Sequence, residues 1–109
     1  MDLEQRGFVT LPFSSPETGS NGHIFYVVTR SPEERQGLIS HLRSQGILAV
    51  FHYVPLHSSQ AGKSYGRTGS TMTVTDRVSA CLLRLPVYYE MTDLETDQVI
   101  DQILKFYAQ

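Results

Sequence analysis

Ring side chains that could bind a small polar molecule gather between residues 51 and 57. His52, Tyr53 and His57 lie there, with Pro55 between them. Imidazole and phenol groups can bind phosphate, sugar hydroxyls or a ring oxygen, and binding groups are often mounted where a strand opens into a loop. The alternative is a structural strand end with one buried histidine, and the residue types alone leave both interpretations open.

Metal chemistry finds little support in this sequence. A structural zinc site needs four ligands, and a catalytic one needs three ligands and a water. His52 and His57 are close in sequence, but His23 and His41 belong to other predicted elements and Cys81 is the only cysteine. We therefore predict no metal site.

Covalent catalysis is also poorly supported. Lys63 and Lys105 are the only lysines, and neither lies in the apolar sequence that would desolvate a Schiff-base lysine. Gly62-Lys63-Ser64 matches the end of a P-loop, but the first glycine of that motif would have to stand at His57. Cys81 lies among small and apolar residues, as is typical of a buried packing residue. We therefore predict no catalytic residue in this chain.

The composition is typical of a soluble globular domain, with 40% apolar residues, 18% charged residues and a net charge of -2. No basic block indicates nucleic-acid binding, and no apolar run approaches the roughly 20 residues of a membrane span. The N-terminal residues do not form a signal peptide, and a single cysteine suits a reducing compartment. We expect a cytoplasmic protein with neither nucleic-acid nor membrane partners.

The elements that position the ring side chains follow from the residue pattern. Residues 23–30 are rich in β-branched and aromatic residues, which predicts a strand buried on both faces. Ser31-Pro32 with Glu34 predicts a helix that starts with a capping box, and Gly46 suits the left-handed residue that ends it. Residues 47–53 predict a second strand, so the ring side chains come at the end of a strand–helix–strand unit.

The rest of the domain is predicted from the same signals. Residues 54–73 are rich in Gly, Ser and Thr and predict an irregular loop, which at that length is often functional. A helix from about 75 to 83 and a short strand at 84–88 follow, and Pro86 favours either an edge position for that strand or the entry to a loop. Thr92-Asp93-Leu94-Glu95 is a second capping box, which begins a long amphipathic helix.

The chain divides into a connector at residues 1–22, in which a short strand could form, and a domain at residues 23–109. The apolar residues Phe8, Val9 and Leu11 belong to this connector. Exposed apolar patches mark interaction sites, so we expect these residues to contribute to self-association or to contact another domain.

Three blocks of the sequence resemble the small C-terminal domain of the DegT/StrS-type sugar aminotransferases, which depend on pyridoxal phosphate. The blocks are His23–Tyr26, Ala49–His57 and Leu82–Tyr89. The middle block is the most specific, and the resemblance extends from His23 to Tyr107. Within the family it is strongest to the transaminases that make dTDP-4-amino-4,6-dideoxygalactose for enterobacterial common antigen.

This resemblance implies an α+β fold, the small domain of fold-type-I aminotransferases, with a short, mostly antiparallel sheet and helices packed on it. For the complete enzyme it implies transfer of an amino group from glutamate, through pyridoxal phosphate, to C4 of a dTDP-4-keto-6-deoxy sugar. The cofactor lysine and most phosphate contacts would belong to a large N-terminal domain, so this chain alone would hold no cofactor. His52, Tyr53, Pro55 and His57 would then bind the nucleotide-sugar substrate.

Three hypotheses about function follow. The chain is the C-terminal domain of a sugar aminotransferase and is inactive alone, or it is a stand-alone nucleotide-sugar-binding module, or it is a protein-interaction domain. The expected partners are the nucleotide sugar, a large aminotransferase domain and a second copy of this chain.

Overall fold

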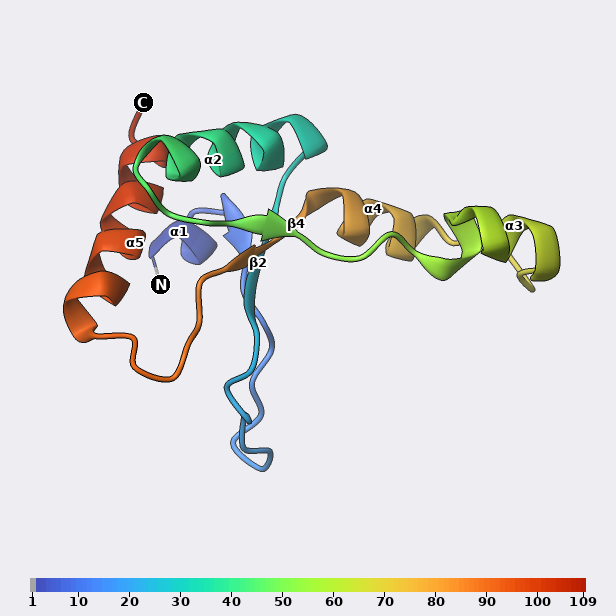
Figure 1. Ribbon diagram of the computed structural model, residues 1–109, viewed down its shortest axis with the longest axis horizontal. Coiled ribbons are helices and arrows are strands. Elements are labelled where there is room, and N and C mark those ends of the chain that lie inside the picture. Colours follow the sequence, from blue (N-terminus) through green and yellow to red (C-terminus); the bar gives the residue numbers. More distant parts are fainter. Residues whose placement is uncertain (1) are drawn as a thin grey trace.

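A short antiparallel sheet forms the centre of the computed structural model, which describes residues 2–109 (Figure 1). Within these residues the sheet has four strands in the order β1-β2-β4-β3. Their bounds are Val9–Thr10 for β1, Phe25–Thr29 for β2, Val50–Phe51 for β3 and Leu82–Leu85 for β4. Since β4 is antiparallel to both β2 and β3, those two strands run parallel to each other on either side of it. The predicted α+β class with a mostly antiparallel sheet is confirmed.

Helices fall into two groups, one packed on the sheet and one that extends away from it (Figure 1). The first group comprises α1 (Asp2–Gln5), α2 (Pro32–Ser44) and α5 (Asp93–Tyr107). The second comprises the 3-10 turn η1 (Leu56–Ser58), α3 (Gln60–Tyr65) and α4 (Thr73–Cys81). We call residues 54–81, which contain the second group, the arm.

The core lies between the sheet and the first group of helices. Leu38 and Leu42 of α2 and Leu83 of β4 are fully buried there, and Val99 and Ile103 of α5 complete the layer. Each fully buried Leu contributes about 1.5–3 kcal/mol relative to an exposed one. This layer therefore holds β4, and with it the sheet, against the helices.

Helix α2 begins as its sequence predicts, with one difference. The Ser31 hydroxyl accepts a hydrogen bond from the Glu34 backbone N–H at 3.1 Å, and Gly46 follows the helix with a φ of 75°. The Glu34 carboxylate, however, binds the Arg30 guanidinium at 2.8 Å and the Tyr107 hydroxyl at 2.8 Å. The predicted capping box is thus only half formed, because stronger partners outside the helix take the carboxylate.

The second predicted capping box is complete. Thr92 accepts a hydrogen bond from the Glu95 backbone N–H, and the Glu95 carboxylate accepts one from the Thr92 backbone N–H at 2.8 Å. Both bonds satisfy amides that the first turn of α5 leaves without helical partners.

Burial of β2 differs from the sequence prediction. Val27 and Thr29 are buried, whereas Phe25, Tyr26 and Val28 are exposed or half-buried. Because alternate residues of a strand face opposite sides of a sheet, only one face of β2 is covered. Burial on both faces was wrong, since Tyr26 and Val28 on the other face are only half-buried.

Several boundaries after residue 46 also differ from the prediction. β3 covers only Val50–Phe51 of the strand expected at 47–53, and α4 ends at Cys81. β4 begins directly after it, at Leu82, and ends at Leu85 before Pro86. Of the two alternatives for Pro86, the edge position was wrong, because β4 pairs with a strand on each side, and Pro86 instead begins the loop that follows β4.

The segment 54–73, predicted to be an irregular loop, is largely helical. The Ser59 hydroxyl accepts a hydrogen bond from the Gly62 backbone N–H and caps α3. Serine is common in loops, but this serine is a helix N-cap. The serine-rich composition of the segment therefore led to the wrong prediction of a loop.

The first residues of the chain share the core of the domain. Leu3 of α1 and Val9 of β1 are buried with Leu83, and Phe8 packs with its ring centroid 5.1 Å from that of Tyr107. Val9 and Phe8 therefore do not form the exposed apolar surface expected from the sequence. Leu11 is likewise packed against the core cluster.

The molecule is extended for its length. Its radius of gyration is 15.7 Å, against about 13 Å for a compact domain of this size. The arm and the loop between β1 and β2 project in different directions and account for the difference (Figure 1). No helix within residues 2–109 is long and apolar enough to cross a membrane.

Candidate functional site

His52 and Tyr53 follow directly after the end of β3, where the chain leaves the sheet. Their rings meet edge to face with centroids 5.0 Å apart, and the Arg84 guanidinium carbon lies 5.8 Å from the Tyr53 ring centroid. The Tyr53 side chain is largely exposed, while Nδ1 of His52 is buried without a hydrogen-bond partner among residues 2–109. This strand end therefore presents two rings in contact and a histidine nitrogen that lacks a hydrogen bond.

His57 lies in η1 and is held by a residue of another element. Its Nε2 is 2.6 Å from Oδ1 of Asp76, in the first turn of α4, and only 17% of the His57 side chain is exposed. A neutral His57 that donates Nε2–H to Asp76 keeps Nδ1 as an acceptor, and a protonated His57 makes Nδ1 a donor. The contact fixes the ring so that Nδ1 can serve a bound molecule in either state.

The sequence analysis missed Asp76. The residue is 19 positions from its partner, and its role depends on α4 and η1 meeting in space. Its position early in a helix was the only available signal, and acidic residues there are common for electrostatic reasons alone.

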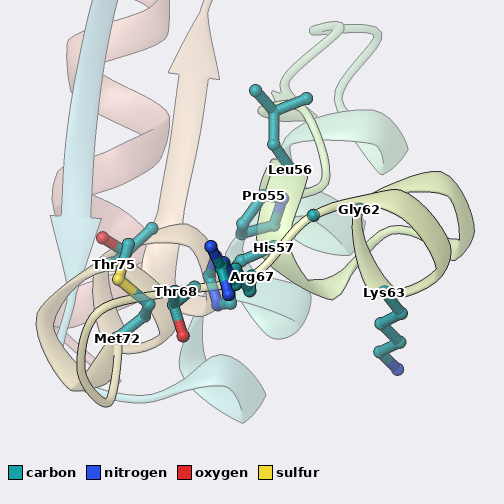
Figure 2. Close-up of a pocket in the computed structure, with 10 residues that line it drawn as sticks. Pro55, Leu56, His57, Gly62, Lys63, Arg67, Thr68, Met72 and Thr75 are labelled. Carbon is teal, nitrogen blue, oxygen red and sulfur yellow. The ribbon is translucent and has the colours of Figure 1, made fainter.

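A hollow of about 620 Å³ lies between η1, α3 and the start of α4. Figure 2 shows Pro55, His57 and Arg67 together in its central part, and Lys63 extending apart from them on α3. Lys63 and Arg67 are both exposed. The lining of the hollow is mainly apolar, and Lys63 and Arg67 add positive charge that suits an anionic molecule.

A second hollow of about 470 Å³ lies beside the first and contains His52 and Tyr53 in its wall. Pro55 lines both hollows, whereas His57 lines only the larger. The four residues predicted to bind substrate thus lie along one segment but serve two adjoining hollows.

Close packing within the arm gives the larger hollow its wall. A side-chain carbon added to Gly62 would lie 1.6 Å from the backbone oxygen of Leu56. Only glycine permits this approach of α3 to η1, so Gly62 helps to set the position of His57 within η1.

The residues of this chain do not fit pyridoxal phosphate. A Schiff-base lysine needs a desolvated setting, but Lys63 is exposed, and Lys105 is exposed and pairs with Asp101 at 2.8 Å. Within residues 2–109, no group of three or more His, Cys, Asp or Glu side chains is arranged to hold a metal ion.

Comparison with known proteins gives a family over nearly the whole chain. The model of the DegT/DnrJ/EryC1/StrS aminotransferase family matches residues 2–104. A curated relative, dTDP-3-amino-3,4,6-trideoxy-alpha-D-glucose transaminase of Streptomyces venezuelae, is 30% identical over 87% of this chain and 24% of its own length. That relative is a glucose-type transaminase, so the galactose-type branch expected from the sequence stays a prediction.

Solved structures agree in fold. DesV of Streptomyces venezuelae, in complex with a ketimine intermediate, is 28% identical with a TM-score of 0.81 over 93% of this chain and 27% of its own. A DegT DnrJ EryC1 StrS aminotransferase from Brucella abortus has a TM-score of 0.83 at 24% identity, over 95% of this chain and 27% of its own. NtdA of Bacillus subtilis, solved with its cofactor PMP, has a TM-score of 0.82 at 22% identity, over 99% of this chain and 25% of its own.

The chain therefore spans about a quarter of the length of the relatives that it matches. Over that quarter the family match and the fold agree, and the chain belongs to the DegT/DnrJ/EryC1/StrS aminotransferase family.

Proposed function

We propose that this chain is the C-terminal, substrate-binding domain of a pyridoxal-phosphate-dependent aminotransferase that aminates a dTDP-4-keto-6-deoxy sugar. The observation that carries the proposal is the pair of adjoining hollows along residues 52–57, in a chain that belongs to a sugar-aminotransferase family. His52, Tyr53, Pro55 and His57 form the wall that contacts the nucleotide sugar.

The wall supplies binding and orientation. His57, fixed by Asp76, offers Nδ1 to a sugar hydroxyl or a phosphate oxygen. Tyr53 presents an exposed ring and hydroxyl, which suit the apolar face and polar edge of a sugar or base. Arg67 adds positive charge at the larger hollow, where the diphosphate of the ligand would be attracted.

When bound in the complete enzyme, pyridoxal phosphate would supply the amino-transfer chemistry. Because neither lysine here is desolvated, we propose that the chain is inactive on its own. Borohydride reduction after incubation with equimolar pyridoxal phosphate, followed by mass spectrometry, tests this point. We expect no more adduct at Lys63 or Lys105 than in the urea-unfolded chain, whereas a stoichiometric adduct at one lysine would refute inactivity.

Ligand-observed NMR with a dTDP-sugar tests the binding role. Saturation transfer from the protein to the base and sugar protons is expected at millimolar ligand, and excess dTDP should reduce it. Absence of transfer at that concentration would contradict a nucleotide-sugar wall in this chain.

A second candidate, a protein-interaction domain, is supported by the exposed apolar residues of the arm. Leu56 is 85% and Val74 is 69% exposed, and both line the second hollow together with Val54. In the complete enzyme this surface would meet the large cofactor-binding domain. A second copy of the chain would cover it in solution.

We further propose that the complete enzyme works in the cytoplasm, in a pathway such as lipopolysaccharide or enterobacterial common antigen synthesis. A reduced, buried Cys81 suits that compartment. Growth of a deletion strain with its antigen sugars analysed would test the pathway.

A further inference from the structure

Arg84 carries a charge that no carboxylate within the described chain neutralises. The ion pairs of residues 2–109 all involve other residues. Nε of Arg84 is buried and has no hydrogen-bond partner there. Buried charged donors are normally paired, so this guanidinium is suited to a group that comes from outside the described chain.

The strand register places Arg84 in the middle of the sheet, on the face opposite the core. It pairs with Tyr26 of β2 on one side and with Val50 of β3 on the other, and paired residues share a face. Its neighbour Leu83 is fully buried against the helices, so Arg84 points the opposite way. The Tyr53 ring, 5.8 Å from the guanidinium carbon, lies beside it.

A hollow of about 190 Å³ opens at this position, lined by Arg84, His23 and apolar residues that include Val50. At about 30 Å³ per water molecule, it has room for on the order of six waters. That space suits a phosphate or carboxylate group and is too small for a whole nucleotide. The hollow is separate from the two that contain the residues of the 52–57 segment.

We propose that Arg84 is the centre of an oxyanion-binding site on this sheet face, which takes a carboxylate or a phosphate group. The planar guanidinium offers paired N–H donors that match either group. His23 lines the same hollow, and the Tyr53 ring lies beside the guanidinium. Only the source of the bound anion rests on the proposed function. That source is the carboxylate of the amino donor or the diphosphate of the nucleotide sugar.

Titration of the isotope-labelled chain with glutarate in one arm and inorganic pyrophosphate in the other tests the site. The Nε–H resonance of Arg84 should shift and saturate at millimolar concentration in at least one arm, and the arm with the tighter binding identifies the source. No saturable shift of this resonance in either arm would overturn the proposal.

Matched variants separate the site from general charge effects. Arg84→Met keeps an apolar stem and should weaken binding at least about tenfold through loss of the paired donors. Arg84→Lys keeps the charge and should lose less, and Arg77→Met, which removes an exposed arginine of α4, should change nothing. Equal affinity in wild type and a folded Arg84→Met or Arg84→Lys chain would refute the site.

The two proposals fail separately. Loss of anion binding at Arg84 with dTDP-sugar binding intact would overturn this site and leave the proposed function. Anion binding at Arg84 without any dTDP-sugar binding would support the site and overturn the nucleotide-sugar wall.

Discussion

The contact between His57 and Asp76 determines what the larger hollow can offer to a ligand. It joins η1 to α4 at 2.6 Å and orients an imidazole that is mostly buried. Without Asp76 the ring could rotate about its side-chain bonds, and the position of Nδ1 would no longer be fixed. We therefore regard Asp76 as a positioning residue for substrate binding.

Asp76→Ala should weaken binding of a dTDP-sugar on the order of tenfold, because a pre-oriented polar group binds without an ordering cost. Protein-observed NMR titration would measure the affinity. Asp97→Ala, which removes an equally exposed carboxylate of α5, is the control and should bind as wild type does. Equal weakening in both variants would show that net charge matters and orientation does not.

At the scale of elements, the packing of α3 on η1 depends on a missing side chain. Gly62→Ala places a carbon 1.6 Å from the Leu56 carbonyl oxygen, so the two elements must separate at a local cost of about 1–3 kcal/mol. Amide resonances of residues 54–68 should shift strongly while those of β2 and β4 stay in place.

Gly69→Ala is the matched control, since nothing lies within 4 Å of an added carbon at that position. Its spectrum should differ from wild type only near the substitution. A Gly62→Ala spectrum with an unchanged arm would contradict the close approach of α3 and η1.

The capping box of α5 makes stability depend on pH. Hydrogen bonds from the Thr92 backbone and then from the Tyr88 hydroxyl hold the pKa of Glu95 below its usual value of 4.5. A depressed carboxyl pKa adds stability above the unfolded value, and this part is lost as pH falls through the folded value. Glu95→Gln should therefore reduce the loss of stability between neutral pH and pH about 3, measured by urea unfolding.

Glu90→Gln, at an exposed carboxylate just before the same helix, controls for the change in charge. It should retain the wild-type dependence on pH. A Glu95→Gln chain whose stability falls with acid as steeply as that of wild type would contradict the role of the cap.

Local signals in the sequence predicted α2, α4, α5 and the approximate strand positions, but not α1, η1 or α3. Ser31-Pro32 and Thr92 mark the starts of α2 and α5, and Gly46 marks an end, because caps act within one turn. Position in the sheet was not predictable in the same way. Pro86 suggested an edge strand, yet β4 lies centrally because Pro86 follows its last residue and leaves the ladder intact.

The candidate site was predictable only in part. The segment His52–His57 stood out by residue type, whereas Asp76 and Arg84 did not. Asp76 depends on a helical arm that the glycine-rich composition concealed, and Arg84 depends on which face of β4 the helices cover. Both are consequences of tertiary packing, which spacing along the chain does not encode.

On the scale of the whole molecule, the extended shape leaves apolar surface on the arm uncovered. Leu56 and Val74 are exposed there, and Phe51 and Tyr53 are exposed at its base. Exposed apolar patches of this kind mark interaction sites. In the complete enzyme the large domain is the partner that we propose for this surface.

The isolated chain should therefore self-associate at high concentration. Leu56→Ser together with Val74→Ser should lower the average mass measured by light scattering, because the double variant removes apolar area from the arm. Leu94→Ser, at an equally exposed leucine of α5, should leave association unchanged. A wild-type chain that stays monomeric at millimolar concentration would refute this prediction.

The central claim is that residues 52–57 and their neighbours form a wall for a nucleotide sugar. Amide NMR titration of the wild-type chain with a dTDP-sugar tests it most directly. We predict saturable shifts at His52, Tyr53, His57 and Asp76 at millimolar ligand, with the helix-covered core unaffected. Saturable shifts confined to other regions, or no shifts at all, would contradict the binding of a nucleotide sugar at residues 52–57.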